Sequence, residues 1–270
     1  MLRQGISMSE QDHLYVLIRV RKSGSQSLVK IMQDAYPESR LHPMPHDPPT
    51  ADLGVGFKEE IRLARRQRKR LRKLYKTTSY PEAWKRCNQT AKSGDIVGGH
   101  FPYGTPDLPD FELRYITIMR HPLKRLYSEY RYCKQSFDQR PWWRRLYTSA
   151  RIQVAGRGSF GDYIDYLDQQ GEHFTNPLVA YITNGDRELT PYEFLRKHYY
   201  HYGLIERAQS FAAKLSSLTG RDVPAAWKNK TRDTGALDGE YYDEAKVQRL
   251  IGEDLKLYDA VLAEIDGNPA

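Results

Sequence analysis

Residues 13–36 read HLYVLIRVRKSGSQSLVKIMQDAY, and this stretch decides the fold. The apolar run from His13 to Val20, bounded by polar residues, is typical of a buried parallel strand. A Ser/Gly turn follows, and from Gln26 to Tyr36 the apolar residues recur at helical spacing. A strand, a Ser/Gly turn and a helix in this order form the opening unit of α/β folds that bind phosphate at a helix N-terminus.

Further segments extend this α/β pattern along the chain. Residues 95–99 and 114–119 are short apolar runs that predict strands, and Pro122 fits the first position of a helix after the second run. A late strand is expected at 199–205. A capping box at 190–193 predicts the start of a helix, and helical apolar spacing predicts helices at 206–218 and 241–265.

We therefore predict an α/β, P-loop-like three-layer fold with a central, mainly parallel sheet flanked by helices. The 270 residues contain no internal repeat, low-complexity tract or linker, which predicts a single domain over residues 1–270. Within it, residues 37–95 are expected to form an insertion of Pro/Gly-rich loop and basic helix. Residues 190–270 are expected to be the helix-rich C-terminal part.

The net charge of +8 comes from one segment rather than from the whole chain. Residues 58–76 hold ten Lys/Arg and two Glu, a local charge equal to that of the protein. This distribution argues against a generally basic protein that binds nucleic acid. The segment is either a helix that steers a polyanionic acceptor or a solvated helix whose arginines pack along their stems.

Cysteine content and hydropathy bound the cellular location. Only Cys87 and Cys133 are present, too few for a disulfide framework or a four-ligand zinc site, which fits a reducing compartment. No apolar run approaches the roughly 18 residues of a membrane span. Residues 1–11 lack the apolar core of a signal peptide, so we expect a cytoplasmic protein without stable membrane insertion.

The turn between the first strand and helix is a candidate phosphate site. Its residues are Arg21, Lys22, Ser23, Gly24, Ser25, Gln26 and Ser27. Backbone N–H groups and the helix N-terminus can cradle an anion here, and Lys22 adds a mobile positive charge. The turn is not a Walker A loop, because Lys22 precedes Gly24 and the upstream glycine of that motif is missing. The alternative is a capped turn without a ligand.

The end of the predicted strand at 114–119 is a second candidate phosphate site. Arg120 directly follows the predicted strand at 114–119, and Ser128 lies two helical turns later. These side chains can converge on one phosphate, with the arginine supplying a bidentate fork. Two such strand ends on one sheet predict a ligand with two separated phosphate-like groups.

Together these segments resemble the sulfotransferases that use 3′-phosphoadenosine 5′-phosphosulfate (PAPS), in particular the carbohydrate (heparan sulfate-type glycan) sulfotransferases. Residues 22–28 resemble the family's 5′-phosphosulfate loop, with Gln26 in place of the usual small hydroxyl residue. Residues 120–130 match its 3′-phosphate motif, R-x-P-x-x-R-x-x-S-x-Y, at every position. The similarity continues, with gaps, through residues 202–207, 229–230 and 255–258.

The resemblance implies in-line transfer of a sulfuryl group from PAPS to an acceptor hydroxyl, expected on a carbohydrate, with PAP as product and no metal. Lys22 would be catalytic, because it would neutralise the sulfuryl and bridging oxygens as the leaving phosphate gains charge. Arg120 and Ser128 would hold the 3′-phosphate. The backbone and hydroxyls of residues 23–27 would hold the 5′-phosphate, and Lys230 would reach the nucleotide from a C-terminal loop.

A hydroxyl acceptor also needs a general base, which is worth about 10²–10⁴ in rate. His100 is our candidate, because it follows a predicted strand in a Gly-Gly-His context between the two cofactor motifs. Glycan sulfotransferases place their base in a similar context. The alternatives are a structural role for His100, His121 as the base, or a glutamate, either Glu59 or Glu60.

Several interpretations stay open. Trp142 and Trp143, followed by two arginines, are either core residues or a sugar-stacking edge. The acceptor hydroxyl can belong to a glycan, a protein tyrosine, a lipid or a small molecule. The alternative functions are a nucleotide kinase-like phosphotransferase and a non-enzymatic module that binds a polyanion through residues 58–76.

Overall fold

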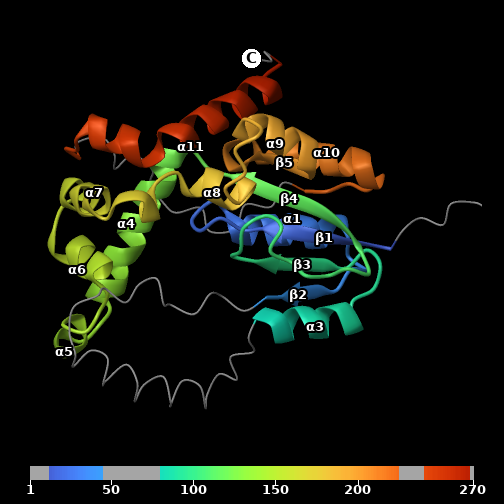
Figure 1. Cartoon of the computed structure of the whole chain (residues 1–270), viewed down its shortest axis with the longest axis horizontal. Coiled ribbons are helices and arrows are strands. Elements are labelled where there is room, and N and C mark those ends of the chain that lie inside the picture. Colours follow the sequence, from blue (N-terminus) through green and yellow to red (C-terminus); the bar gives the residue numbers. More distant parts are fainter. Residues whose placement is uncertain (1–11, 45–79, 225–239, 268–270) are drawn as a thin grey trace, which may run out of the picture.

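The computed structural model describes residues 12–44, 80–224 and 240–267. Its central sheet has five strands, all parallel, in the order β2-β3-β1-β4-β5 (Figure 1). They are β1 His13–Ile18, β2 Leu41–Pro43, β3 Ile96–Gly99, β4 Glu112–Met119 and β5 Tyr199–Leu204. The predicted α/β class and parallel sheet are confirmed, and β2 is a strand that the sequence pattern did not reveal.

Helices cover both faces of the sheet and complete three layers (Figure 1). One face carries α1 Ser25–Ala35 and α10 Ala208–Thr219; the other carries α3 Tyr80–Thr90, α8 Pro177–Thr183, α9 Pro191–His198 and part of α11 Glu244–Ile265. Side chains alternate along a strand, so neighbouring residues of β1 belong to different cores. Val16 packs with the α8 and α9 residues, whereas Leu17 packs with those of α1 and α10. Burial on both faces explains the continuous apolar run of β1.

A group of helices lies beside the sheet and starts where β4 ends. It comprises α4 Pro122–Asp138, α5 Trp142–Arg145, α6 Ala150–Arg157 and α7 Phe160–Gln169. Its own core contains Tyr130, Phe160 and Tyr163, packed against Leu250 of α11. Helix α4 therefore runs from the sheet edge into this second core.

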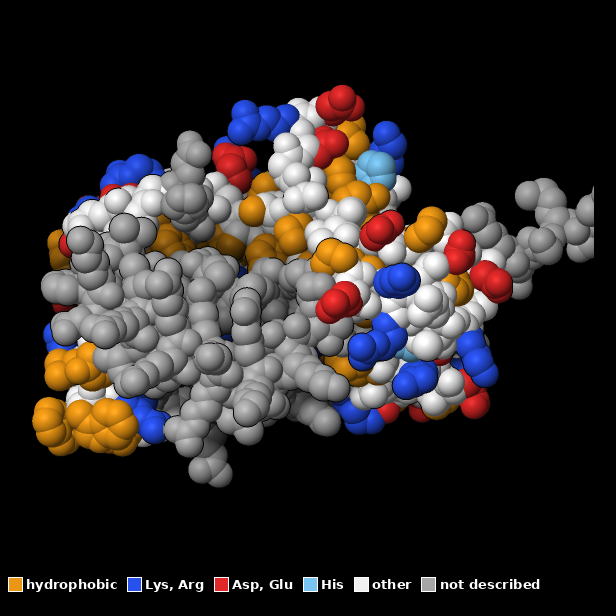
Figure 2. All heavy atoms as spheres, turned by 60° about the horizontal axis from the view of Figure 1, so that its bottom comes forward, with side chains coloured by type: hydrophobic (Ala, Val, Ile, Leu, Met, Phe, Trp, Pro, Cys, Tyr) orange, Lys and Arg blue, Asp and Glu red, His pale blue; other side chains and the backbone are white. Residues whose placement is uncertain are grey.

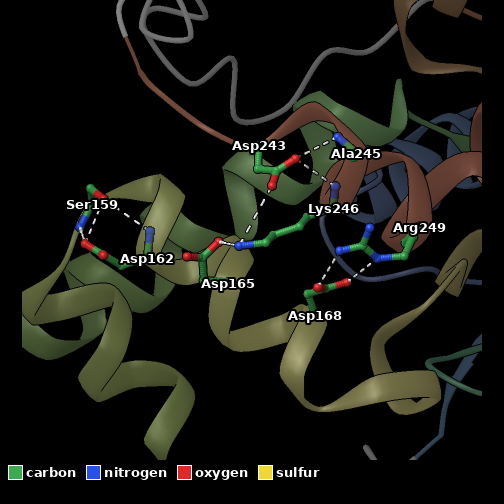
Figure 3. Close-up of polar contacts among 8 residues, drawn as sticks. All are labelled: Ser159, Asp162, Asp165, Asp168, Asp243, Ala245, Lys246 and Arg249. Carbon is green, nitrogen blue, oxygen red and sulfur yellow. Dashed lines mark hydrogen bonds and ion pairs between the residues drawn. The ribbon is translucent and has the colours of Figure 1, made fainter.

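Ion pairs join the N-terminal half of α11 to α7, and a side-chain cap defines the start of α11 (Figure 3). Arg249 donates two hydrogen bonds to Asp168, from Nε at 3.0 Å and from Nη2 at 2.8 Å. Lys246 Nζ lies 2.8 Å from Asp165 Oδ1. The Asp243 carboxylate accepts the N–H groups of Ala245 and Lys246, which fixes where α11 begins.

Side-chain-to-backbone hydrogen bonds in both directions, which we call the latch, join α8 to the middle of α11. There Ile251 leaves helical geometry, with φ of −137° and ψ of 15°. The Asn176 side-chain oxygen accepts the N–H groups of Glu253 and Asp254 at 3.0 and 3.3 Å. In return Asp254, which is fully buried, accepts the first N–H groups of α8, those of residues 178 and 179. Burial raises the pKa of Asp254 to about 6, and Arg125 opposes this shift. The latch supplies polar partners where the helix is broken.

The remaining predicted elements have mixed outcomes. The capping box at 190–193 is confirmed at the start of α9. The segment 37–95, predicted as loop and basic helix, also contributes β2, α3 and most of the approach to β3. The predicted basic helix at 58–76 lies outside the described residues. Within the part of the chain that the structure describes, no helix is long and apolar enough to cross a membrane.

Candidate functional site

The sheet brings three of the predicted residues to one edge. Ile18, near the end of β1, is in register with Gly99 of β3 and Thr117 of β4. Adjacent strands lie about 4.8 Å apart, so the carboxyl ends of these three parallel strands meet. His100 directly follows β3 and Arg120 directly follows β4, while Lys22 lies in the loop just after β1. The sequence motifs therefore meet at a single site at the carboxyl ends of these strands.

The loop from β1 to α1 has the backbone of an anion cradle. Lys22 and Gly24 both adopt left-handed conformations, with φ of 65° and 82°. Gly24 is the N-cap of α1 and has no side chain to satisfy the first-turn N–H groups. A Cβ at Gly24 would lie 2.9 Å from Ile205 Cγ1, so close packing also requires glycine. The N-terminus of α1, with its partial positive charge, consequently opens onto this loop.

The Lys22 side chain reaches across to α4. Its ammonium lies 4.5 Å from the centre of the Tyr132 ring, a cation–π contact. Burial lowers the pKa of Lys22; Glu129 opposes this shift, whereas Arg120 lowers the pKa further. This lysine and Arg120 are therefore neighbours in one positive region, although they come from different strand ends.

Arg120 shares its surroundings with Glu206, which follows β5. Burial lowers the pKa of the Arg120 guanidinium, and Glu206 opposes the shift. Glu206 Oε1 accepts the N–H group of His121 at 3.1 Å, so this carboxylate also holds the start of α4. The end of β5 thus contributes a fourth strand end to the site, beside Arg120.

Buried polar atoms without a hydrogen-bond partner in the described structure gather around the same edge. They are the Arg19 Nε, Ser23 Oγ and His121 Nδ1 atoms and the acceptor Glu206 Oε2. Ser23 is only 1% exposed, and burial lowers the pKa of Arg19. Unsatisfied buried groups are costly, so a cluster of them needs an explanation. A phosphate or sulfate group would accept from the Ser23 hydroxyl and the Arg19 guanidinium, and these donors fit the predicted PAPS.

His100 is half-buried and its ring is oriented by β1. Its Nδ1 is hydrogen-bonded to the backbone carbonyl of Arg19. A carbonyl only accepts, so this contact assigns the proton to Nδ1 and leaves the lone pair on Nε2. That tautomer is the one that a general base requires, with Nε2 as the accepting atom.

Glu129 and Arg151, which the sequence patterns did not single out, support the site from α4 and α6 together with Arg125 of the 120–130 motif. Glu129 accepts hydrogen bonds from Arg125 Nη1 at 3.1 Å and from Arg151 Nη1 at 2.5 Å. Arg125 is 3% exposed, so this is a buried charge cluster next to Lys22. The i,i+4 spacing of Arg125 and Glu129 is a signal for their pairing, but nothing local indicates Arg151.

The other predicted site residues lie as follows. Ser25, Gln26 and Ser27 form the first turn of α1, and Ser128 is half-buried on α4. Arg21 is exposed. The proposed nucleotide contact Lys230 and the alternative bases Glu59 and Glu60 lie outside the described residues.

The comparisons with known proteins identified no relative of this chain. Neither a scan against protein-family models nor a search of curated proteins found a match to the chain.

In residues 12–44, 80–224 and 240–267, no group of three His, Cys, Asp or Glu side chains is arranged to hold a metal ion.

Proposed function

We propose that this protein is a PAPS-dependent sulfotransferase that transfers a sulfuryl group to an acceptor hydroxyl, with a carbohydrate as the expected acceptor. The observation that carries the proposal is the meeting of Lys22, in the loop at the N-terminus of α1, with Arg120 at the adjacent strand end. Two cationic groups on neighbouring strand ends suit a ligand with two anionic groups. The match of residues 120–130 to the 3′-phosphate motif supports the same assignment.

Binding would be divided between the two strand ends. The N-terminus of α1 and the Ser23 hydroxyl would hold the 5′-phosphate, as N–H groups at a helix start do for many phosphates. Arg120 and Ser128 would hold the 3′-phosphate. Arg19, whose Nε lacks a hydrogen-bond partner in the described structure and whose side chain lies near Gly98 of β3, would add a further donor at the end of β1.

The transfer step needs a base and charge stabilisation. The acceptor oxygen bonds to sulfur while the bond from sulfur to the bridging phosphate oxygen breaks, and the electron pair leaves with PAP. His100 Nε2 would take the hydroxyl proton, and Lys22 would stabilise the charge that develops on the bridging oxygen. Rotation of Lys22 away from the Tyr132 ring would bring the ammonium to that oxygen.

Calorimetry tests the ligand class. We expect PAP to bind the protein in the absence of metal, and ATP with magnesium to give no heat of binding. Binding of ATP with magnesium and not of PAP would favour the kinase-like alternative. Failure of both nucleotides to bind would refute the enzyme assignment and leave the polyanion-binding module.

Three variants separate the roles within the site. Arg120→Ala should weaken PAP binding about 10–100-fold, the effect of losing a charged bidentate contact. Lys22→Ala should lower sulfate transfer about 10²–10³-fold. His100→Ala should lower it about 10²–10⁴-fold while PAP binding persists. Lys256→Ala, an exposed lysine on α11, is the matched control and should change neither. Retained transfer in His100→Ala would move the base to another residue.

The acceptor can be identified with the same preparation. Radiolabelled sulfate would be transferred from PAPS into a crude cell extract, which is then separated into glycan, lipid and protein fractions. Label in the glycan fraction that disappears with Lys22→Ala is the expected result. Label confined to the lipid or protein fraction would overturn the carbohydrate assignment while preserving the reaction type.

A further inference from the structure

A cluster of aromatic and arginine side chains projects from the end of α4 that lies away from the sheet. We call it the aromatic–arginine surface, defined by Trp142, Trp143, Arg144, Leu146 and Tyr147. Its four apolar members are 76%, 47%, 52% and 61% exposed, respectively. Figure 2 shows hydrophobic side chains gathered beside Lys/Arg side chains at the end of the molecule where Figure 1 places α5. Of the two alternatives for Trp142 and Trp143, a position in the core is excluded, because α5 contributes no buried side chain.

The backbone beneath this surface is firmly anchored, so the exposure is built into the fold. Arg145 donates hydrogen bonds to the carbonyl oxygens of Arg140 and Asp138, both at 2.9 Å. Its guanidinium also packs 5.0 Å from the centre of the buried Phe137 ring. The Arg144 guanidinium lies 4.8 Å from the Trp143 ring, which orients that ring.

The charge of the segment is entirely positive. Residues 139–161 contain five arginines and no Asp or Glu. Arg151 is engaged by Glu129, but Arg140 and Arg144 have no carboxylate partner within the described structure. An anionic partner is therefore electrostatically complementary to this surface.

The side-chain chemistry distinguishes between anionic partners. A sugar hydroxyl needs hydrogen-bond acceptors as well as donors, but Trp and Arg side chains only donate and Leu does neither. Within the surface, only Tyr147 can accept. Trp and Tyr rings favour the membrane–water interface, where Leu enters the acyl boundary and Arg meets the headgroup phosphates. The surface also projects from the molecule (Figure 1), which suits a flat partner.

We propose that the aromatic–arginine surface binds the protein peripherally to a bilayer that contains anionic lipid. Trp142, Trp143, Leu146 and Tyr147 would enter the interface, and Arg140 and Arg144 would contact the headgroups. This proposal does not depend on the sulfotransferase assignment. PAP binding therefore serves as an independent check that each variant is folded, or urea unfolding does so where PAP does not bind.

Sedimentation with vesicles tests the proposal. We expect the protein to bind vesicles of phosphatidylcholine with about one-third phosphatidylserine far more tightly than vesicles of phosphatidylcholine alone, and less tightly as salt rises. Arg140→Gln with Arg144→Gln should weaken binding about 25-fold, or about fivefold for each charge. Arg187→Gln with Arg221→Gln, both exposed elsewhere, is the matched control and should have less than about one-tenth of that effect.

The aromatic contribution has a separate readout. Trp142→Ala with Trp143→Ala should weaken vesicle binding by about 100-fold, or about tenfold for each ring. Tyr241→Ala, which removes an 89% exposed ring elsewhere, should leave binding unchanged. In a Trp227→Phe background, brominated lipids should quench tryptophan fluorescence in the protein that keeps Trp142 and Trp143 and not in the double variant, because the remaining Trp84 is only 4% exposed.

Two outcomes would overturn the proposal. The first is equal vesicle binding by the parent protein and by both double variants. The second is binding of a soluble sulfated polysaccharide that needs Trp142 and Trp143 while anionic vesicles are not bound, which would make the surface a sugar-stacking edge.

Discussion

Replacing Gly24 with alanine should destabilise the protein by about 2–5 kcal/mol, through two effects that experiment can separate. The first effect is conformational, because Gly24 has φ of 82°, where a Cβ costs about 1–2 kcal/mol. The second effect is steric, because the new Cβ would lie 2.9 Å from Ile205 Cγ1 and 3.0 Å from Cδ1. Ile205 is 4% exposed and has little room to move, so overpacking should add about 1–3 kcal/mol.

Urea unfolding followed by circular dichroism measures the total effect, and two comparisons separate its parts. Gly220 has φ of 66° and nothing lies within 4 Å of the position that a Cβ would take there, so Gly220→Ala bears only the conformational cost. Ile205→Ala removes the two clashing atoms, so adding Gly24→Ala in that background should cost about 1–2 kcal/mol rather than about 2–5 kcal/mol. Gly24→Ala should also weaken PAP binding, whereas Gly220→Ala should not.

An equal cost of Gly24→Ala in the parent and Ile205→Ala backgrounds would refute the steric part of this reasoning. A cost no larger than that of Gly220→Ala would do the same. If Gly24→Ala lost stability as expected but bound PAP normally, the loop would be structurally important without being the phosphate site.

Three further perturbations test the parts of the fold that support the site. Burial alone raises the pKa of Asp95, but hydrogen bonds from His42 and from the N–H groups of residues 40 and 92 outweigh it and lower the pKa below its ordinary value. Its stabilising contribution is therefore full at pH values well above the ordinary aspartate pKa and is lost as the pH falls through the lowered pKa, so the gap in urea midpoint between the parent and Asp95→Asn should be large near neutral pH and should shrink progressively as the pH falls below about 4. Asn176→Gly keeps the left-handed backbone (φ 44°) but removes the acceptor for two N–H groups of α11, and should cost about 1–3 kcal/mol in urea unfolding; no change would mean that water replaces the amide. Arg249→Ala breaks the exposed ion pair with Asp168, so it should lower the urea midpoint only slightly, and the difference should vanish in about 1 M salt; a large, salt-independent loss would show that its stem packing matters more than its charge.

The elements that the sequence predicts well are those with a strong local signal. Strand β1 is buried on both faces, so its apolar run stands out, and α4 begins at a proline that suits a helix start. Strand β2 has only three residues and ends in Pro43, within a proline-rich stretch that is typical of a loop. Its pairing with β3 makes it a strand, and that partner lies more than 50 residues away.

The start of α8 and the break in α11 depend on each other rather than on local sequence. The Asn176 side chain accepts the N–H groups of residues 253 and 254, and the Asp254 side chain accepts those of residues 178 and 179, across more than 70 residues. The same limit holds at the candidate site. The turn at Lys22 and the strand end at Arg120 could be predicted from spacing, but the contact of Lys22 with Tyr132 and the role of Glu206 follow only from the packing of α4 and β5.

The charges around the site are arranged so that its cations remain available to a ligand. Burial lowers the pKa of both Lys22 and Arg120, and no ion pair joins either side chain to a carboxylate within the described part of the chain. The nearby carboxylates are engaged elsewhere: Glu129 accepts from two arginines, and Glu206 accepts the N–H group of His121. They moderate the repulsion between the cations without neutralising them directly. An anion at the N-terminus of α1 would relieve that repulsion and the cost of burial together. The proposed anion-binding role would also account for the left-handed conformation of Lys22, which has φ of 65° and is unfavourable for a residue with a Cβ.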